Sequence, residues 1–103
     1  MEDFMKDFRS YWLAVRLYRI AARLKAPRHL RDQLERAASS VCLNLAEGYG
    51  RRQVRDKGHF YQIAFGSLRE VQAILELLSP EHNDAKAMAD QLGGALYRLC
   101  SHR

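Results

Sequence analysis

Proline and glycine are scarce in this sequence. Two prolines, Pro27 and Pro80, and six glycines interrupt 103 residues, so few positions favour turns and long helices are expected. The chain also lacks an apolar run of about 18 residues, which excludes a transmembrane helix. The N-terminal stretch carries acids and no continuous apolar core, so it does not resemble a signal peptide. We therefore expect a cytoplasmic protein with no membrane partner.

Cysteine and histidine are too few and too scattered for a disulfide-stapled or metal-bound fold. Cys42 and Cys100 form no C-x-x-C pair, so we expect reduced thiols that pack as small apolar groups. The four histidines lack the short spacings of zinc ligands. The sequence therefore predicts no metal and no cofactor.

Apolar residues recur at helical spacing along the chain, and no strand-like alternation competes with them. The spacing predicts four helices, at about Phe4–Lys25, Pro27–Glu47, Gln53–Leu78 and Pro80–Cys100. Pro27 suits a first helical turn. Ser79-Pro80 provides an N-cap followed by proline, and Gly48 suits a left-handed C-terminal cap. Because short loops force neighbouring helices to run antiparallel, we expect an all-α fold, a single up-and-down four-helix bundle over residues 1–103.

The expected first helix has two apolar stripes, although a bundle core needs only one. The aromatic stripe consists of Phe4, Phe8, Tyr11, Trp12, Val15, Tyr18 and Ala22. The leucine stripe consists of Leu13, Leu17, Ile20 and Leu24 and lies on nearly the opposite side. Because contiguous apolar patches usually mark interfaces, we assign the leucine stripe to self-association.

The third helix has one broad apolar stripe, which we expect to be core. It consists of Phe60, Ile63, Ala64, Ser67, Leu68, Val71, Ile74, Leu75 and Leu78. Tyr61 and Phe65 fall outside this stripe. They complete the predicted oligomer interface of Leu13, Leu17, Ile20, Leu24, Tyr61 and Phe65.

Positive charge is concentrated in the first half of the chain. Residues 1–57 contain 13 Lys/Arg and 7 Asp/Glu, whereas residues 58–103 contain 4 and 5. Arg16, Arg19 and Arg23 have no acid three or four residues away within the first helix. A charged stripe is more often only a solvated helix face, but this pattern also predicts a phosphate-binding surface for RNA or DNA. The candidate residues are Arg9, Arg16, Arg19, Arg23, Arg51, Arg52, Arg55 and Lys57.

Polar side chains border the apolar stripe of the second helix. Ser40, Asn44 and Glu47 follow one another about a turn apart, and Arg36 precedes them. We expect them to bond to an adjacent helix, with Glu70 as the partner of Arg36 or Asn44. Ser40 has no histidine near it in sequence to act as a base, which argues against catalysis. We call Arg36, Ser40, Asn44, Glu47 and Glu70 the polar ladder and expect it to be structural.

Two other functions compete with nucleic-acid binding. Some helical-bundle ribonucleases carry an arginine, four to six residues, and then a histidine, and both Arg23–His29 and Arg52–His59 fit this pattern. About as many matches arise by chance in so arginine-rich a chain, so the pattern does not point to catalysis. The other alternative is a protein-binding scaffold without nucleic-acid binding, in which the leucine stripe, Tyr61 and Phe65 bind a different chain.

Two segments carry a family resemblance. They are "LRDQLERAASSVCLNLAEGYGRR" and "HFYQIAFGSLREVQAIL". They resemble the family of 23S rRNA intervening-sequence proteins, also called four-helix bundle proteins. The family pattern is Gln-Leu-x-Arg-Ala-x-x-Ser-[Ile/Val]-x-x-Asn-[Ile/Leu]-Ala-Glu-Gly, then an arginine, then a helix with [Ile/Leu]-Ala-x-Gly-Ser-Leu-x-Glu. The matching residues are Gln33, Leu34, Arg36, Ala37, Ser40, Val41, Asn44, Leu45, Ala46, Glu47, Gly48, Arg51, Ile63, Ala64, Gly66, Ser67, Leu68 and Glu70.

The resemblance implies a four-helix bundle that forms a homopentameric ring. It also implies a relation to the accessory variability determinants of diversity-generating retroelements, which look like basic nucleic-acid-binding partners of a reverse transcriptase. Family members are encoded in bacterial genomes, within inserts of 23S rRNA genes or elsewhere, so the family name records a gene location and not an activity. From charge and stripes together we expect a non-enzymatic, self-assembling bundle that binds nucleic acid electrostatically.

Overall fold

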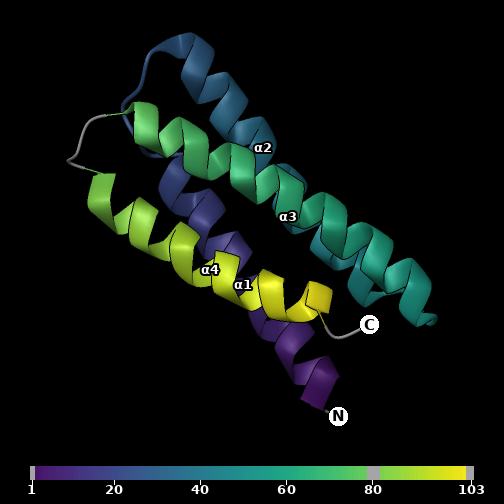
Figure 1. Cartoon of the computed structure of the whole chain (residues 1–103). Helices are drawn as coiled ribbons and strands as arrows, with labels where there is room; N and C mark the ends of the chain where they lie inside the picture. Colours follow the sequence, from purple (N-terminus) through teal and green to yellow (C-terminus); the bar gives the residue numbers. More distant parts are fainter. Residues whose placement is uncertain (1, 79–81, 102–103) are drawn as a thin grey trace.

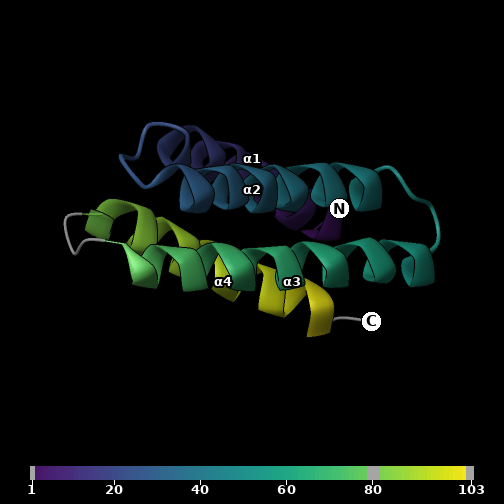
Figure 2. The same ribbon diagram turned by 90° about the horizontal axis from the view of Figure 1, so that it is seen from above.

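The computed structural model describes residues 2–78 and 82–101, with side chains from Phe8 onward. These residues form four α-helices, α1 (Glu2–Ala21), α2 (Arg28–Tyr49), α3 (Val54–Leu77) and α4 (Asn83–Ser101). Successive helices run antiparallel, with α1 and α2 in one layer and α3 and α4 in the other (Figures 1 and 2). Both α1 and α3 pack against α2 and α4. The predicted all-α, up-and-down four-helix bundle is therefore confirmed. None of the described helices is long and apolar enough to cross a membrane.

The helix ends differ by a few residues from the prediction. Pro27 precedes α2 instead of starting it, because its φ of −54° and ψ of 145° are extended. Its carbonyl accepts the helical bond from the Arg31 amide at 2.9 Å, which makes Pro27 the N-cap residue. The first helix ends at Ala21 and not at Lys25. The predicted N-cap Ser79 and first-turn Pro80 lie outside the described residues.

Gly48 is not the left-handed C-cap that we predicted. It lies inside α2, and the capping residue is Gly50, with φ −79° and ψ −7°. No glycine in the described ranges has a positive φ. Gly48 instead permits a close approach to α3, since a Cβ at this position would lie 2.5 Å from Cε1 of Tyr61.

A core of aliphatic side chains runs between the two layers, with contributions from all four helices. The largest fully buried side chains are Leu17, Leu34, Val41, Leu45, Leu68, Val71, Leu75, Leu92 and Leu96. Burying one such side chain stabilises the fold by about 1.5–3 kcal/mol. This core is therefore the main source of the bundle's stability.

The first helix turns the opposite side inward from the one we expected. Leu17 is only 1% exposed. The rest of its stripe is half-buried against the same core, at Leu13, Ile20 and Leu24. Three small residues complete the inward face, namely Ser10, Ala14 and Ala21. Phe8 and Trp12 are each 44% exposed. The leucine stripe therefore faces the core, so our assignment of this stripe to self-association was wrong. Of the aromatic stripe, Tyr11 and Tyr18 also pack against the core, whereas Phe8 and Trp12 stay outside.

Tyr61 belongs to the core and Ile63 does not, contrary to the predicted stripe of α3. Tyr61 is 4% exposed and Ile63 is 40% exposed. Tyr61 lies two turns before the buried Leu68 and shares its face, whereas Ile63 is about 140° away from Leu68 around the helix. Phe65 is half-buried and packs against the core. Tyr61 is therefore not available for the predicted oligomer interface.

Candidate functional site

The arginines of α1 and of the turn after it form an exposed row. Its members are Arg9, Arg16, Arg19 and Arg23, which we call the arginine row. The ion pairs Arg51–Glu47 and Lys86–Glu76 involve residues outside α1. No carboxylate in the described part of the chain pairs with the arginine row. These guanidinium groups therefore keep their charge available to an external anion.

Exposed aromatic rings lie beside the arginine row, where α1 meets the end of α2. The ring centroid of Phe8 lies 6.1 Å from that of Trp12 and 6.5 Å from that of Tyr49. A hollow of about 240 Å³ is lined by Phe8, Tyr11, Trp12, Ala46 and Tyr49. A second hollow of about 350 Å³ brings Phe8 and Trp12 together with Arg9 and Arg16. Flat rings and guanidinium groups thus share one surface.

The predicted arginines of the α2–α3 connection differ in how free they are. Nη2 of Arg51 pairs with Oε2 of Glu47 at 3.0 Å, and the Arg51 guanidinium lies over the ring of Phe60, 4.8 Å from its centroid. Arg52 and Arg55 are exposed, and no ion pair engages them within the described ranges. Of the predicted residues 51, 52, 55 and 57, Arg52 and Arg55 are therefore the two whose charge is not engaged by described residues.

Lys57, which we predicted to bind phosphate, is occupied at the end of α2. Its Nζ donates to the carbonyl of Gly48 at 3.2 Å and to the carbonyl of Tyr49 at 3.0 Å. Nζ also lies 5.9 Å from the centroid of the Tyr49 ring. A positive charge at a helix C-terminus satisfies exposed carbonyls and offsets the helix dipole. The geometry of Lys57 is therefore that of a capping residue.

The arginine row and the basic residues around the α2–α3 connection do not form one continuous surface. The contact between Phe8 and Tyr49 places the start of α1 level with the end of α2. Arg23 follows Phe8 by some four helical turns, so it lies roughly 20 Å further along the bundle. Only the Arg9 end of the arginine row approaches the α2–α3 connection, and the aromatic rings lie between.

The polar ladder bonds across to α3 through Ser40, and not through the partner that we predicted. Oγ of Ser40 lies 2.7 Å from Oγ of Ser67, and Nδ2 of Asn44 donates to the carbonyl and hydroxyl oxygens of Ser40 at 2.9 and 3.1 Å. Glu70 is exposed, and within the described residues it bonds to neither Arg36 nor Asn44. Glu70 lies about 60° further around α3 than Ser67, which moves it away from α2. The hydrogen bond between Ser40 and Ser67 links α2 to α3 instead.

The described side chains do not gather into a metal centre. No group of three or more His, Cys, Asp or Glu residues lies close enough together to hold a metal ion in that part of the chain. The hydroxyl of Ser40 contacts Ser67 and Asn44, neither of which is a base. Burial raises the pKa of the Cys42 thiol to about 11, so this thiol is neutral at ordinary pH.

Two site features escaped the sequence reasoning. One is the exposure of Phe8 and Trp12, and the other is the buried hydroxyl of Ser10, which is 2% exposed. The sequence contains one pattern that indicates both features. Ser10, Ala14 and Leu17 recur at i, i+4 and i+7, as regularly as the leucine stripe itself. A face built from small residues was overlooked because such residues are only weakly apolar.

Comparison with known proteins places these features in a family. The chain matches the family described as 23S rRNA-intervening sequence protein over residues 8–99. This span includes the arginine row, the exposed rings and the polar ladder. Neither the curated proteins nor the solved structures gave a match to the chain. Because the family match covers most of its length, the chain belongs to the 23S rRNA-intervening sequence protein family.

Proposed function

We propose that this protein is a non-enzymatic, self-assembling cytoplasmic bundle that binds RNA or DNA through the surface of α1. The observation that carries the proposal is the arginine row. Three of its members, Arg16, Arg19 and Arg23, are exposed on one side of one helical segment, with no carboxylate partner among the described residues. Unpaired arginines in a row suit the regularly spaced phosphates of a nucleic-acid backbone, which they contact without reading sequence.

The rings beside the row favour nucleic acid that contains unpaired bases. Phe8 and Trp12 are 44% exposed and share a hollow with Arg9 and Arg16. Unpaired bases stack on exposed aromatic side chains while the backbone follows the cations. We therefore expect looped RNA to bind more tightly than duplex DNA of equal charge. The resemblance to accessory variability determinants fits the same activity.

Self-assembly is the second part of the proposal. It rests on the resemblance, which implies a homopentamer, and on large apolar side chains that stay exposed away from α1. Leu43 is 67% exposed on α2, and Ile63 is 40% exposed on α3. Light scattering is expected to give a mass about five times that of the 11.9 kDa chain. A mass equal to that of one chain would refute this part alone.

The binding test is a titration of labelled looped RNA and duplex DNA at several salt concentrations. The test variant changes Arg16, Arg19 and Arg23 to Gln. The control variant changes Arg28, Arg31 and Arg36 to Gln, three exposed arginines on α2. Both variants lose the same net charge, so a difference between them reports position and not total charge.

We expect binding by the parent chain to weaken steeply with salt. Each lost phosphate contact reduces the log–log salt slope by about 0.9 on duplex DNA, so the α1 variant is expected to lose nearly three units of slope and the α2 control much less. Equal loss in both variants would refute a surface on α1. No binding of either nucleic acid at low salt would refute the proposal and favour a protein-binding scaffold that uses the apolar hollow at Trp12.

A further inference from the structure

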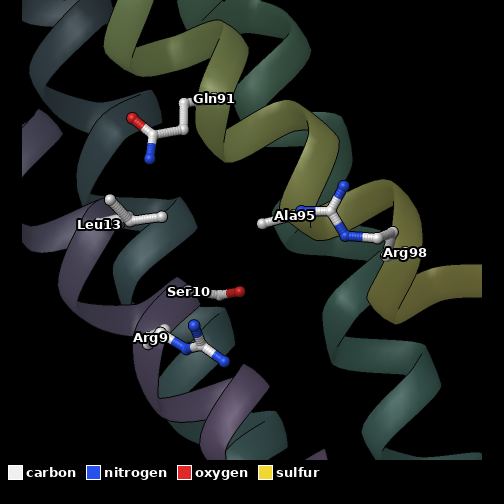
Figure 3. A pocket seen from close by; sticks show the side chains of 6 residues that line it. All are labelled: Arg9, Ser10, Leu13, Gln91, Ala95 and Arg98. Carbon is white, nitrogen blue, oxygen red and sulfur yellow. The ribbon is translucent and has the colours of Figure 1, made fainter.

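A cleft lies between α1 and α4, beside the first turns of α1 and the last turns of α4 (Figure 3). Its volume is about 260 Å³, and its lining consists of Arg9, Ser10, Leu13, Gln91, Ala95 and Arg98. Figure 3 shows the Arg9 guanidinium and the Ser10 hydroxyl turned toward the cleft from α1, and the Gln91 amide turned toward α1 from α4. Arg9, Leu13 and Gln91 also line the neighbouring hollow at Trp12 and Arg16, whereas Ser10, Ala95 and Arg98 do not.

Ser10 is the unusual member of this lining. It is 2% exposed, yet its hydroxyl has no hydrogen-bond partner among the described residues. Each of the other described serines, such as Ser40 and Ser101, bonds through its hydroxyl. No described side-chain oxygen or nitrogen is both fully enclosed and unpartnered. The Ser10 oxygen is therefore reached through the cleft, and its hydrogen-bonding capacity is directed there.

The charged groups of the cleft are also unpaired. Neither Arg9 nor Arg98 meets a carboxylate in the part of the chain that the structure describes. Asp90, the acid next to Gln91, accepts a bond from Gln72 of α3 at 3.1 Å instead. Two unpaired guanidinium groups, one from each helix, make the electrostatic potential of the cleft positive. The cleft therefore attracts negative charge.

One of these cations folds back along α4. A Cβ built on Gly94 would lie 3.7 Å from Nη1 of Arg98, so the guanidinium folds back along the helix over the glycine. Figure 3 shows the Arg98 side chain returning in this way toward Ala95 and the cleft. The Arg98 charge is thus held on the cleft side of α4.

We propose that the α1–α4 cleft binds a phosphate group. Guanidinium groups only donate hydrogen bonds, and the Ser10 hydroxyl and the Gln91 amide add donors from other directions, so the matching ligand is rich in acceptors. Donors that approach from both walls and the base fit a tetrahedral oxyanion better than a flat carboxylate. The volume is below the usual range for drug-sized ligands, so the cleft takes a single group and not a whole nucleotide. The cleft shares Arg9 with the proposed nucleic-acid surface, but the inference does not rest on nucleic-acid binding.

The test is a titration with inorganic phosphate at constant ionic strength, followed by two-dimensional amide NMR, with chloride as the exchanged anion. The variants are Ser10→Ala and Arg98→Gln, and the control is Arg31→Gln, which removes the same charge from an exposed position on α2. We expect saturable shifts around residues 9–13 and 91–98. Loss of one charged hydrogen bond weakens binding about tenfold, so Ser10→Ala and Arg98→Gln are expected to show this loss and Arg31→Gln is not.

Two further readouts keep the result interpretable. Ser10→Ala is expected to unfold at a higher temperature than the parent, because alanine is the better helix former and buries no unpartnered hydroxyl. If Arg98→Gln weakens phosphate binding but not RNA binding, the natural ligand is a small phosphate compound. If it weakens both, the ligand is a backbone phosphate. Shifts that do not saturate, or that persist in both cleft variants, overturn the inference whatever the RNA result.

Discussion

Gly48 and Gly66 allow the packing of α2 on α3 to be tested by one substitution made at two places. A Cβ on Gly48 would lie 2.5 Å from Cε1 and 2.9 Å from Cδ1 of Tyr61, and 3.2 Å from Cβ of Phe60. Ordinary carbon contacts are about 3.5–4.0 Å. The Tyr61 ring is 4% exposed, so it has no free space to move into. Gly48→Ala therefore forces the helices apart or displaces the ring.

The magnitude follows from two opposing effects. Alanine is a better helix former than glycine by about 1 kcal/mol, whereas overpacking a filled core costs about 1–3 kcal/mol. A contact this short belongs at the upper end of that range, so we expect Gly48→Ala to lower the free energy of unfolding by about 1–2 kcal/mol. Gly66 lies exposed on α3 with nothing within 4 Å of a Cβ. Gly66→Ala is therefore expected to raise stability by about 0.5–1 kcal/mol.

Urea and thermal denaturation followed by circular dichroism measure both variants, at one protein concentration because self-association changes apparent stability. We expect Tm to fall by about 5–15 °C for Gly48→Ala and to rise for Gly66→Ala. In a Tyr61→Ala background the two shortest contacts are absent and only that with Cβ of Phe60 remains, so Gly48→Ala is expected to cost much less stability. A Gly48→Ala variant as stable as the parent would refute the close approach of Gly48 to Tyr61.

Three further predictions concern the polar ladder, the α2 cap and the buried thiol. Ser40→Ala removes the partner of Ser67 and is expected to lower the free energy of unfolding, measured by urea denaturation, by about 1 kcal/mol. Part of this loss is expected to return in the Ser40→Ala/Ser67→Ala double variant, and full additivity of the two substitutions would contradict the bond between the serines. Lys57→Met keeps the apolar stem but loses the capping bonds, so it is expected to cost about 1 kcal/mol, and unchanged stability would argue against the cap. The raised pKa of Cys42 means that its alkylation rate, measured by peptide mapping, should climb until pH approaches about 11. A plateau near the ordinary thiol pKa would contradict the burial of Cys42.

The fold could be predicted because proline is scarce and the apolar residues keep a helical period over long stretches. Pro27 lies between α1 and α2, and the long stretches on either side keep a clear helical period. The ends were less predictable, because a cap depends on local backbone geometry. Gly48 looked like a cap from its residue type, yet the helix continues past it to Gly50, where the capping bond to Ala46 forms.

The inward side of α1 could not be predicted from hydrophobicity. Both stripes are apolar, and the aromatic one is the larger. What separates them is size, since Ser10, Ala14 and Ala21 share a side with Leu17 and let α1 lie close to its neighbours. A hydrophobicity scale, which gives large apolar side chains the highest values, therefore predicts the wrong buried side for α1.

The candidate site was predictable only where one helix carries it. The lack of nearby acids around Arg16 is visible in the sequence, and the exposure of that residue agrees with it. The cleft was not predictable, because Arg9 and Arg98 lie at opposite ends of the chain and meet only when α4 packs against α1. Nothing in either local segment distinguishes these two arginines from the others.

The packing of α1 explains why rings and arginines share a surface. Once the small residues face inward, the outward arc contains Trp12, Arg16 and Arg19, which recur at i, i+4 and i+7 and therefore lie on one face. The arrangement that fills the core thus also places an indole ring beside two guanidinium groups. Leu17 contributes to the core from the other side of the helix. Because different side chains carry the two roles, the surface of α1 is open to substitution without loss of the packing that holds the bundle together.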